Sequence, residues 1–237
     1  MLAVHWFLTV RLGLVLDDPS EARRLYRELD RGRDTPLLLC ANHLTLIDSA
    51  LIGWMLGSPA SYIPRFHALP WNVPEMSNFA ATWSQRVMSY VYKCIPIERG
   101  GNRSAVARTL ARFTEALRQG DVGLIFPEAG RSRSGRVEVE RAAYGVGRIV
   151  RALPDCRVLC IYLRGDRQAT YSDLPAKGDH LRARLRVVEP KTDHRGLRAS
   201  LDIARQITQV LADLEVEHLA RHPQTPAASA VPEGATT

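Results

Sequence analysis

The stretch LLLCANHLTLIDSALIGWML, residues 37–56, contains the pattern that decides the fold. It opens with Leu37–Ala41, a short apolar run without alternation, which is typical of a strand buried on both faces. Asn42 favours a turn, and the apolar residues of Ser49–Leu56 indicate a short helix that ends near Gly57. A buried strand, a turn and a helix in this order form the repeating unit of α/β folds with parallel strands.

The same alternation of strands and helices continues toward the C-terminus. Apolar residues recur every three or four positions in Asn102–Gln119, which Gly120 closes, and in Leu197–Leu219, so both segments predict amphipathic helices. Two short apolar runs, Val122–Phe126 and Val158–Leu163, predict further buried strands. The predicted fold class is therefore α/β, with a mixed, largely parallel sheet flanked by helices.

The segment Leu181–Val188 differs from these strands because its residues alternate. Arg182, Arg184 and Arg186 share one face and apolar residues share the other, which predicts a half-exposed strand. The arginine face suits water, and it also suits anionic lipid headgroups or an acidic carrier protein.

The two ends of the chain differ from its middle. Residues 1–16, MLAVHWFLTVRLGLVL, predict an N-terminal helix that either packs on the core or lies in a membrane interface. His5 and Arg11 interrupt this run, which is shorter than the roughly 20 apolar residues that a bilayer span requires. The small, Pro-rich residues 222–237 predict a disordered tail. We expect a single domain over residues 1–221, with a partly irregular segment at Ser61–Tyr92.

The charge of the chain points to an anionic partner without identifying it. The formal net charge is +7, and Lys93, Lys177 and Lys191 are the only lysines among 32 cationic residues. The rigid fork of arginine suits phospholipid, phosphate esters, acidic protein or nucleic acid, and a solvated basic surface has the same composition. The sequence contains no RNA-reading aromatic pattern and no recognition-helix motif, so we expect no nucleic-acid partner.

The four cysteines lie far apart, at Cys40, Cys94, Cys156 and Cys160. They form no CxxC pair and no zinc-ligand spacing. This indicates buried thiols in a reducing compartment, and we expect no metal site.

His43 and Asp48 are candidate catalytic residues at the end of the first strand. On one continuous helix a spacing of five residues would turn the two side chains about 140° apart, so they meet only if His43 lies in the turn and Asp48 in the first helical turn. Thr45 is a fair N-cap for that helix. Asp48 would then hold one ring nitrogen, while the other accepts a proton from a hydroxyl group. The same residues also suit a polar strand-to-helix turn without catalysis.

Polar residues also follow two other apolar runs. The block IFPEAGRS, residues 125–132, places Glu128 and Arg131 after a predicted strand, where they would bind substrate hydroxyls and a phosphate. The block CIPIERGG, residues 94–101, indicates a short strand followed by Arg99 and a helix N-terminus, which would form an anion site. A tight turn with a local Glu–Arg contact and an ordinary surface loop are the alternatives. In a parallel sheet all these groups would gather at one edge.

No protein nucleophile accompanies the His–Asp pair. A serine hydrolase would need GxSxG after a strand, and the nearest match, GRSRS at Gly130–Ser134, ends in serine. Each cysteine lies in an apolar or Pro-flanked context. The pair therefore favours a base that acts on the hydroxyl of the substrate itself, as in acyl transfer by direct attack. A hydrolase, the enzymatic alternative, would release free fatty acid.

The blocks NHLTLID, IPIER, FPEAGRS and VLCIYL, in this order, resemble the glycerolphosphate and lysophospholipid acyltransferase family. The resemblance implies transfer of a fatty acyl group to the hydroxyl of a lysophospholipid such as 1-acylglycerol-3-phosphate. The donor would be an acyl-CoA or acyl-carrier-protein thioester, a co-substrate, and no cofactor is implied. In the family the motif's histidine is the base and its aspartate orients it, which here implies His43 and Asp48. The residues that shape the acceptor site would be Arg99, Glu128, Gly130 and Arg131.

The resemblance also implies a cellular setting. It implies a membrane-associated enzyme, peripheral or monotopic, at the cytoplasmic face. Its partners would be membrane lipids and acyl-CoA or acyl carrier protein.

The sequence departs from the family pattern in three of the four blocks. The third block usually reads FPEGTRS, and Ala129-Gly130 replace Gly-Thr here. Pro96 stands where Phe is usual, and Cys160 where Pro is usual. These changes preserve the reaction class and leave the acceptor open. CoA-independent transacylation of the tafazzin type and acylation of a specialised lipid are alternatives, and a non-catalytic module that binds anionic lipid is the alternative of another class.

Overall fold

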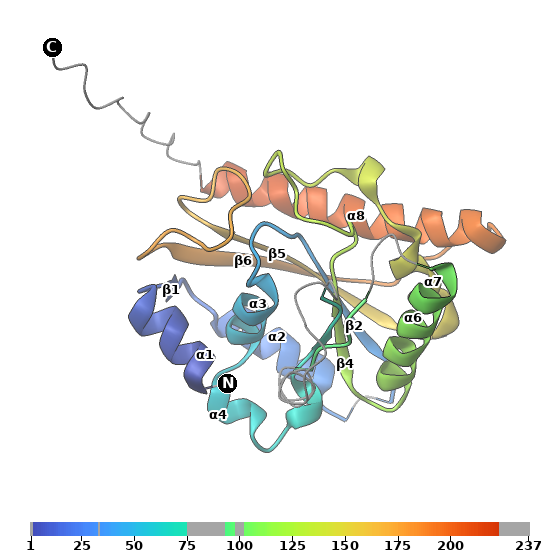
Figure 1. The fold of residues 1–237 in the computed structure, drawn as a ribbon, viewed down its shortest axis with the longest axis horizontal. Helices are drawn as coiled ribbons and strands as arrows, with labels where there is room; N and C mark the ends of the chain where they lie inside the picture. Colours follow the sequence, from blue (N-terminus) through green and yellow to red (C-terminus); the bar gives the residue numbers. More distant parts are fainter. Residues whose placement is uncertain (1, 33, 75–92, 98–101, 223–237) are drawn as a thin grey trace, which may run out of the picture.

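The computed structural model describes residues 2–32, 34–74, 93–97 and 102–222. Its centre is a six-stranded sheet in the order β1-β6-β5-β2-β4-β3 (Figure 1). All neighbouring strands in this sheet are parallel except β5 and β6. The strands are β1 (Val15–Leu16), β2 (Leu37–Ala41), β3 (Trp71–Asn72), β4 (Val122–Ile125), β5 (Arg157–Gly165) and β6 (His180–Val188). The predicted α/β class with a mixed, largely parallel sheet is confirmed.

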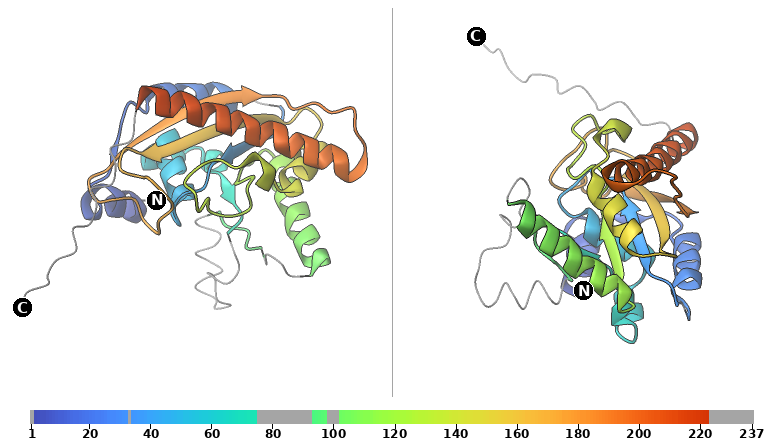
Figure 2. Two further views of the ribbon diagram at one scale, coloured as in Figure 1. Left: turned by 90° about the horizontal axis from the view of Figure 1, so that it is seen from above. Right: turned by 90° about the vertical axis from the view of Figure 1, so that its right-hand side faces the viewer.

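Helices cover both faces of the sheet, as Figures 1 and 2 show. One core lies under the N-terminal helices and the other under the C-terminal helices. Leu37 and Leu39 of β2 belong to the first core, and Leu38 and Cys40 to the second, so β2 is buried on both faces as predicted. The helices are α1 (Leu2–Trp6), η1 (Phe7–Arg11), α2 (Ser20–Asp30), α3 (Asp48–Leu56), α4 (Pro59–Tyr62), η2 (Phe66–Ala68), α6 (Arg103–Arg118), η4 (Val139–Arg141), α7 (Tyr144–Ala152) and α8 (Gly196–Arg221).

The N-terminal helix is shorter than expected. It ends at Arg11, because the chain turns at Gly13 with a φ of 63° and then enters β1, so the expectation of a helix through residue 16 is wrong. Leu8 is buried in the first core, whereas Trp6 is 58% exposed and shares an exposed stripe with Leu2 and Val10. None of the helices in the described residues combines the length and apolar character needed to cross a membrane.

β6 is half-exposed, as predicted, and two arginines on its polar face are paired with acids of the same chain. The helix α8 runs across β5 and β6 (Figure 1). Arg182 forms ion pairs with Asp17 and Asp166, and Arg186 pairs with Glu217 of α8. The protein's own acids therefore neutralise much of this face.

Cys94 and Ile95, which begin the segment predicted as a short strand, lie along the edge of the sheet at β3. Cys94 forms an isolated parallel bridge with Asn72, and the backbone N–H of Ile95 donates to the carbonyl of Asn72 at 2.9 Å. The segment thus follows the sheet edge without forming a full strand. Arg99 and the tail from residue 223 onward lie outside the described residues.

Candidate active site

The loop after β2 is tied to the neighbouring strand by one side chain. The amide of Asn42 donates to the carbonyl of Leu163 at 3.0 Å and accepts from its backbone N–H at 2.8 Å. Asn42 therefore pairs with the end of β5 as another strand residue would, while its own backbone is free to turn. This places the following residue, His43, at the carboxyl edge of the sheet, where open α/β sheets bind their ligands.

His43 and Asp48 are in contact. The Nδ1 atom of His43 lies 2.9 Å from Oδ2 of Asp48, and both side chains are largely buried. With Nδ1 engaged by the carboxylate, the tautomer that donates from Nδ1 presents the lone pair of Nε2. The geometry predicted for the pair, with His43 in the turn and Asp48 in the first helical turn, is confirmed.

The carboxylate of Asp48 is held by three further donors. The backbone N–H groups of Leu44 and Thr45 donate to Oδ2 at 2.6 and 2.8 Å, and the hydroxyl of Thr45 donates to Oδ1 at 2.5 Å. Thr45 is therefore not the N-cap that the sequence predicts, since α3 begins at Asp48 with Ile47 as its N-cap. These donors fix the carboxylate, and the carboxylate in turn fixes the imidazole ring.

The loop after β4 completes the surroundings of His43. β2 and β4 are parallel neighbours, with Cys40 opposite Ile125. The ring of Phe126 stacks on the imidazole with 4.1 Å between centroids, and the N–H of Ser132 donates to the carbonyl of His43 at 2.9 Å. The gathering of the two blocks at one edge of the sheet is therefore confirmed.

Ala129 occupies the position where the family pattern has glycine. Its φ is 52°, in the left-handed region that a side chain with a Cβ atom adopts at a cost of about 1–2 kcal/mol. The backbone of this turn thus retains a shape suited to glycine, and Ala129 carries the strain.

Glu128 lies just inside the sheet edge and is 5% exposed. Its Oε1 accepts the backbone N–H of Glu138 at 2.9 Å, while the buried Oε2 has no hydrogen-bond partner among the described residues. Burial raises the pKa of Glu128 from 4.5 to about 7, although the bond from the Glu138 amide opposes the shift. The side chain therefore carries a proton over much of the pH range below 7 and can donate from Oε2.

This pKa shift predicts how stability depends on pH. Between about pH 4.5 and 7 the folded protein binds more protons at Glu128 than the unfolded chain, so stability falls as pH rises through this window. We expect Glu128→Gln to remove this contribution and to gain stability over the wild type, by on the order of 1–3 kcal/mol at pH 8. Thermal melts of both proteins at pH 5 and pH 8 measure it; an equal difference at the two pH values would contradict the assignment.

The other predicted acceptor-site residues are placed differently. Arg131 donates to Oδ1 of Asp173 at 2.8 Å and to the carbonyl of Ser172 at 3.3 Å, and its guanidinium lies over the ring of Tyr171. Gly130 faces open space, with no atom near the position of an added Cβ. The predicted role of Arg99 cannot be placed because that residue lies outside the described ranges.

Sequence reasoning missed the roles of three residues of the site. Phe126, Ser132 and Thr45 contact His43 or Asp48 through a ring, a backbone N–H and a hydroxyl. Phe126 and Ser132 flank the predicted acceptor residues in the block IFPEAGRS, so position within the block was the available signal. The Ser132 contact uses only backbone atoms, which leave no signature in residue type.

An apolar cavity of about 480 Å³ opens beside the pair. Phe126 lines this cavity and also stacks on the ring of His43. Residues of β4, α6 and α7 line it as well. The lining is almost entirely apolar: Val73, Ile97, Val106, Leu110, Leu124, Ile125, Phe126, Pro127, Ala129, Ala143, Tyr144, Gly145 and Val146. The size and apolar lining of this cavity suit a hydrocarbon chain, and Phe126 is the lining residue that also contacts the imidazole.

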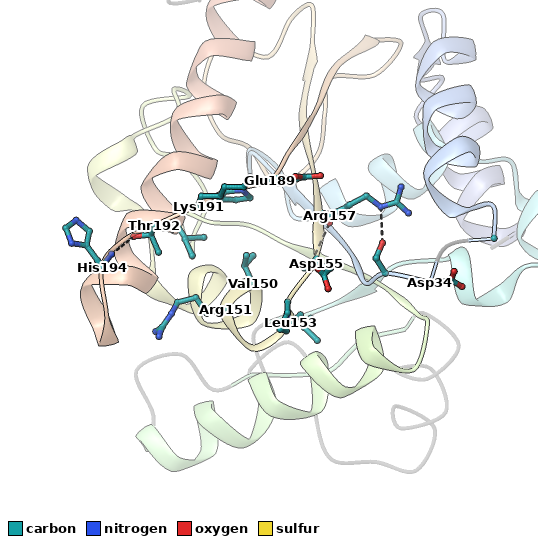
Figure 3. Close-up of a pocket in the computed structure, with 16 residues that line it drawn as sticks. Asp34, Val150, Arg151, Leu153, Asp155, Arg157, Glu189, Lys191, Thr192 and His194 are labelled. Carbon is teal, nitrogen blue, oxygen red and sulfur yellow. Dashed lines mark hydrogen bonds between the residues drawn. The ribbon is translucent and has the colours of Figure 1, made fainter.

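A second cavity, of about 850 Å³, lies at the opposite end of the strands (Figure 3). Arg157 at the start of β5 and Thr35 before β2 line it, so it is remote from the carboxyl edge. Its lining mixes cations such as Lys191 with acids such as Glu189. It contains neither member of the His–Asp pair.

Among the described residues no three His, Cys, Asp or Glu side chains gather as metal ligands would.

Comparison with known proteins identifies the chain by family. No curated protein matches the chain. A family model described as acyltransferase matches residues 22–183, a range that includes the His–Asp pair, the FPE block and β5. The chain therefore belongs to the acyltransferase family, that of the glycerolphosphate and 1-acylglycerol-3-phosphate acyltransferases.

Proposed function

We propose that the protein transfers a fatty acyl group from an acyl-CoA or acyl-carrier-protein thioester to the hydroxyl of a lysophospholipid such as 1-acylglycerol-3-phosphate. The observation that carries this proposal is the contact of His43 with both Asp48 and Phe126. One face of the imidazole thereby contacts Phe126, which also lines the apolar cavity, while Nδ1 is held by a carboxylate. A hydroxyl and an acyl carbonyl can meet at Nε2.

The reaction needs no covalent enzyme intermediate. Nε2 of His43 takes the proton of the acceptor hydroxyl as its oxygen forms a bond to the thioester carbonyl carbon. The carbon–sulfur bond then breaks, and the proton passes from His43 to the departing thiolate. Asp48 stabilises the imidazolium that exists between the two proton transfers.

The apolar cavity is the proposed site of the acyl chain. Gly145 lines it, and a Cβ added there would meet only Leu110 Cδ1, at 3.9 Å, so a larger side chain would extend into the cavity. Space taken by that side chain is lost to the distal methylenes of the substrate. The size of the side chain at position 145 therefore limits the length of the acyl chain that the donor can carry.

We expect Gly145→Leu to shift the preferred donor toward shorter chains. Each methylene excluded from the cavity costs about 0.8 kcal/mol, or about fourfold in kcat/KM. The kcat/KM values for a series of saturated acyl-CoA donors measure the shift, with Gly145→Ala as the control of smaller volume. A uniform loss of activity across all chain lengths would count against this location for the chain.

The proposed acceptor site is built from the loop after β4. Oε2 of Glu128 is buried without a hydrogen-bond partner among the described residues, and we assign it to a glycerol hydroxyl on the family pattern. Arg131 is paired with Asp173, whose side chain is 75% exposed, and such exposed pairs contribute about 0–1 kcal/mol. A phosphate can therefore displace Asp173 from Arg131 at little cost, and we assign Arg99 to the same phosphate on the family pattern.

We further propose that the enzyme works on the cytoplasmic face of a membrane, as a peripheral or monotopic protein. Leu46, three residues from His43, is 54% exposed, and its N–H donates to the carbonyl of Asp173 at 3.1 Å. Tyr171 and Leu174 are also exposed, and they lie on either side of Asp173 in the loop after β5. Together with the exposed stripe of Leu2, Trp6 and Val10, these side chains support docking on lipid near the catalytic loop.

One experiment tests both parts of the proposal. Purified protein is mixed with vesicles that contain lysophosphatidic acid, with labelled acyl-CoA and acyl-carrier-protein thioester as separate donors. Product lipid reports acyl transfer, and flotation of the same sample reports vesicle binding. Binding without product from either donor would overturn the proposed donor and acceptor, and a labelled phospholipid donor without CoA would then test transacylation. Product without binding would overturn the membrane role.

A further inference from the structure

A buried ion pair connects α8 to β5, the strand that lies beside β2 in the sheet order. Arg164 of β5 is 2% exposed, and its Nη1 lies 3.3 Å from Oε1 of Glu215, which is on α8. The hydroxyl of Tyr162 donates to the same oxygen at 3.0 Å. His218 packs against Tyr162, and burial lowers the pKa of His218 to about 4, so it adds no second positive charge beside Arg164.

The guanidinium of Arg164 bonds two loops at the same time. Nη1 donates to the carbonyl of Gly135 at 2.6 Å, in the loop after β4. Nε and Nη2 donate to the carbonyls of Gln168 and Ala169, both at 2.8 Å, in the loop after β5. Glu215 strengthens the first attachment, because its Oε2 accepts the backbone N–H of Val137 at 3.1 Å.

The same two loops hold the backbone of the catalytic loop. From the loop after β4, Ser132 donates its N–H to the carbonyl of His43 at 2.9 Å. From the loop after β5, Ser172 donates to the carbonyl of Leu44 at 3.0 Å, and the carbonyl of Asp173 accepts from Leu46 at 3.1 Å. The loops after β4 and β5 therefore hold His43 in position, and Arg164 forms hydrogen bonds to both loops.

We propose that Arg164 and Glu215 are positioning residues for the catalytic histidine: the pair clamps the two loops that hold residues 43–46. Glu215 lies beyond the family-matched residues 22–183, so α8 contributes to the active site from outside the matched region. Neither residue touches the reacting atoms. The inference rests on the proposed acyl transfer for its kinetic consequence, and on geometry alone for the attachment of the loops.

A purely structural role makes a different prediction. Replacing a buried ion pair with apolar residues of similar volume is often neutral or stabilising, whereas removing one partner is strongly destabilising. The double variant Arg164→Met/Glu215→Leu therefore avoids the isolated buried charge that either single variant would leave, and it removes every side-chain bond from the clamp to the loops. A structural pair would leave kcat unchanged in this variant.

We expect the double variant to fold with a lowered melting temperature, because backbone groups of the loops lose their partners. At temperatures where it is fully folded, we expect it to lose about 10²-fold in kcat, because small displacements of catalytic groups have effects of this size. The KM for the acyl donor stays near its wild-type value, since neither residue lines the apolar cavity. Amide hydrogen exchange accelerates at residues 130–138 and 166–173 but not in β2. Arg164→Lys retains the charge and loses the fork, so it shows the same loss of kcat.

The matched control is another ion pair between the sheet and the same helix. Arg186 of β6 pairs with Glu217 of α8, and within the described part of the chain neither side chain bonds to the two loops. Arg186→Met/Glu217→Leu keeps wild-type kcat and wild-type exchange in both loops. Unchanged exchange in the clamp variant overturns the proposal, and so does wild-type kcat. The exchange result requires no turnover, so failure of the proposed acyl transfer would be recognised separately by inactivity of the wild type.

Discussion

Replacement of His43 by alanine is expected to lower kcat about 10⁴-fold, the upper range for loss of a general base. The reason is geometric: Asp48 holds Nδ1 at 2.9 Å and the ring is stacked on Phe126, which leaves Nε2 to take the proton of the acceptor hydroxyl in the proposed reaction. The proposed mechanism assigns the proton of the acceptor hydroxyl to this imidazole alone, so its removal leaves the step without a base. The measurement is single-turnover acyl transfer with saturating donor and acceptor.

The protein contains its own control for this experiment. His180 also contacts an aspartate through Nδ1, at 2.8 Å from Oδ1 of Asp17, but it lies half-exposed at the start of β6. We expect His180→Ala to retain wild-type kcat. Equal losses in the two variants would show that a general effect on folding, and not proton transfer at His43, limits activity.

Asp48→Asn is expected to have a smaller effect, about 10²-fold in kcat. Oδ2 of Asp48 accepts two backbone N–H groups as well as His43, so only the oxygen of an asparagine fits there. Its amide nitrogen would face Thr45 Oγ1, which can accept a hydrogen bond. The histidine tautomer is thus preserved, and the loss comes from the missing negative charge beside the imidazolium.

The residue pattern predicted the parts of the fold that depend on local sequence. Leu37–Ala41 is β2, and the helix predicted at Asn102–Gln119 is α6, with Asn102 as its N-cap. Burial of a strand on both faces and the period of a helix are properties of neighbouring residues, so they are visible in the sequence. The His–Asp contact follows from the same local logic, because strand, turn and helix together span only a few residues.

The rest depends on partners far away in the sequence. β1 and β3 have two residues each, too few for a period, and they form only because β6 and β4 offer free edges. The antiparallel placement of β6 beside β5 brings α8 over the arginine face, so that Arg186 forms a half-exposed ion pair with Glu217 of α8. The clamp of Arg164 and Glu215 joins residues 51 positions apart, and neither shares a motif with His43.

The second large effect is expected at the crossing of α7 and α8. A Cβ added to Gly147 would lie 1.8 Å from the carbonyl oxygen of Ser200 and 2.8 Å from its Cα. Both of these are backbone atoms of α8, so no side chain can rotate away. The two helices must therefore separate, and the core between them loses contacts.

We expect Gly147→Ala to cost about 3 kcal/mol or more, at the upper end for overpacked cores, and to lower Tm by roughly 6–12 °C. The matched variant is Gly145→Ala, two residues earlier on α7, where an added Cβ meets only Leu110 Cδ1 at 3.9 Å. There the change is expected to stabilise by about 0.5–1 kcal/mol, because alanine loses less backbone entropy in a helix than glycine. Thermal and urea unfolding of both variants measure the contrast. Similar Tm values for the two would mean that α7 and α8 are not in backbone contact at Gly147, and that this glycine reflects something other than close helix packing.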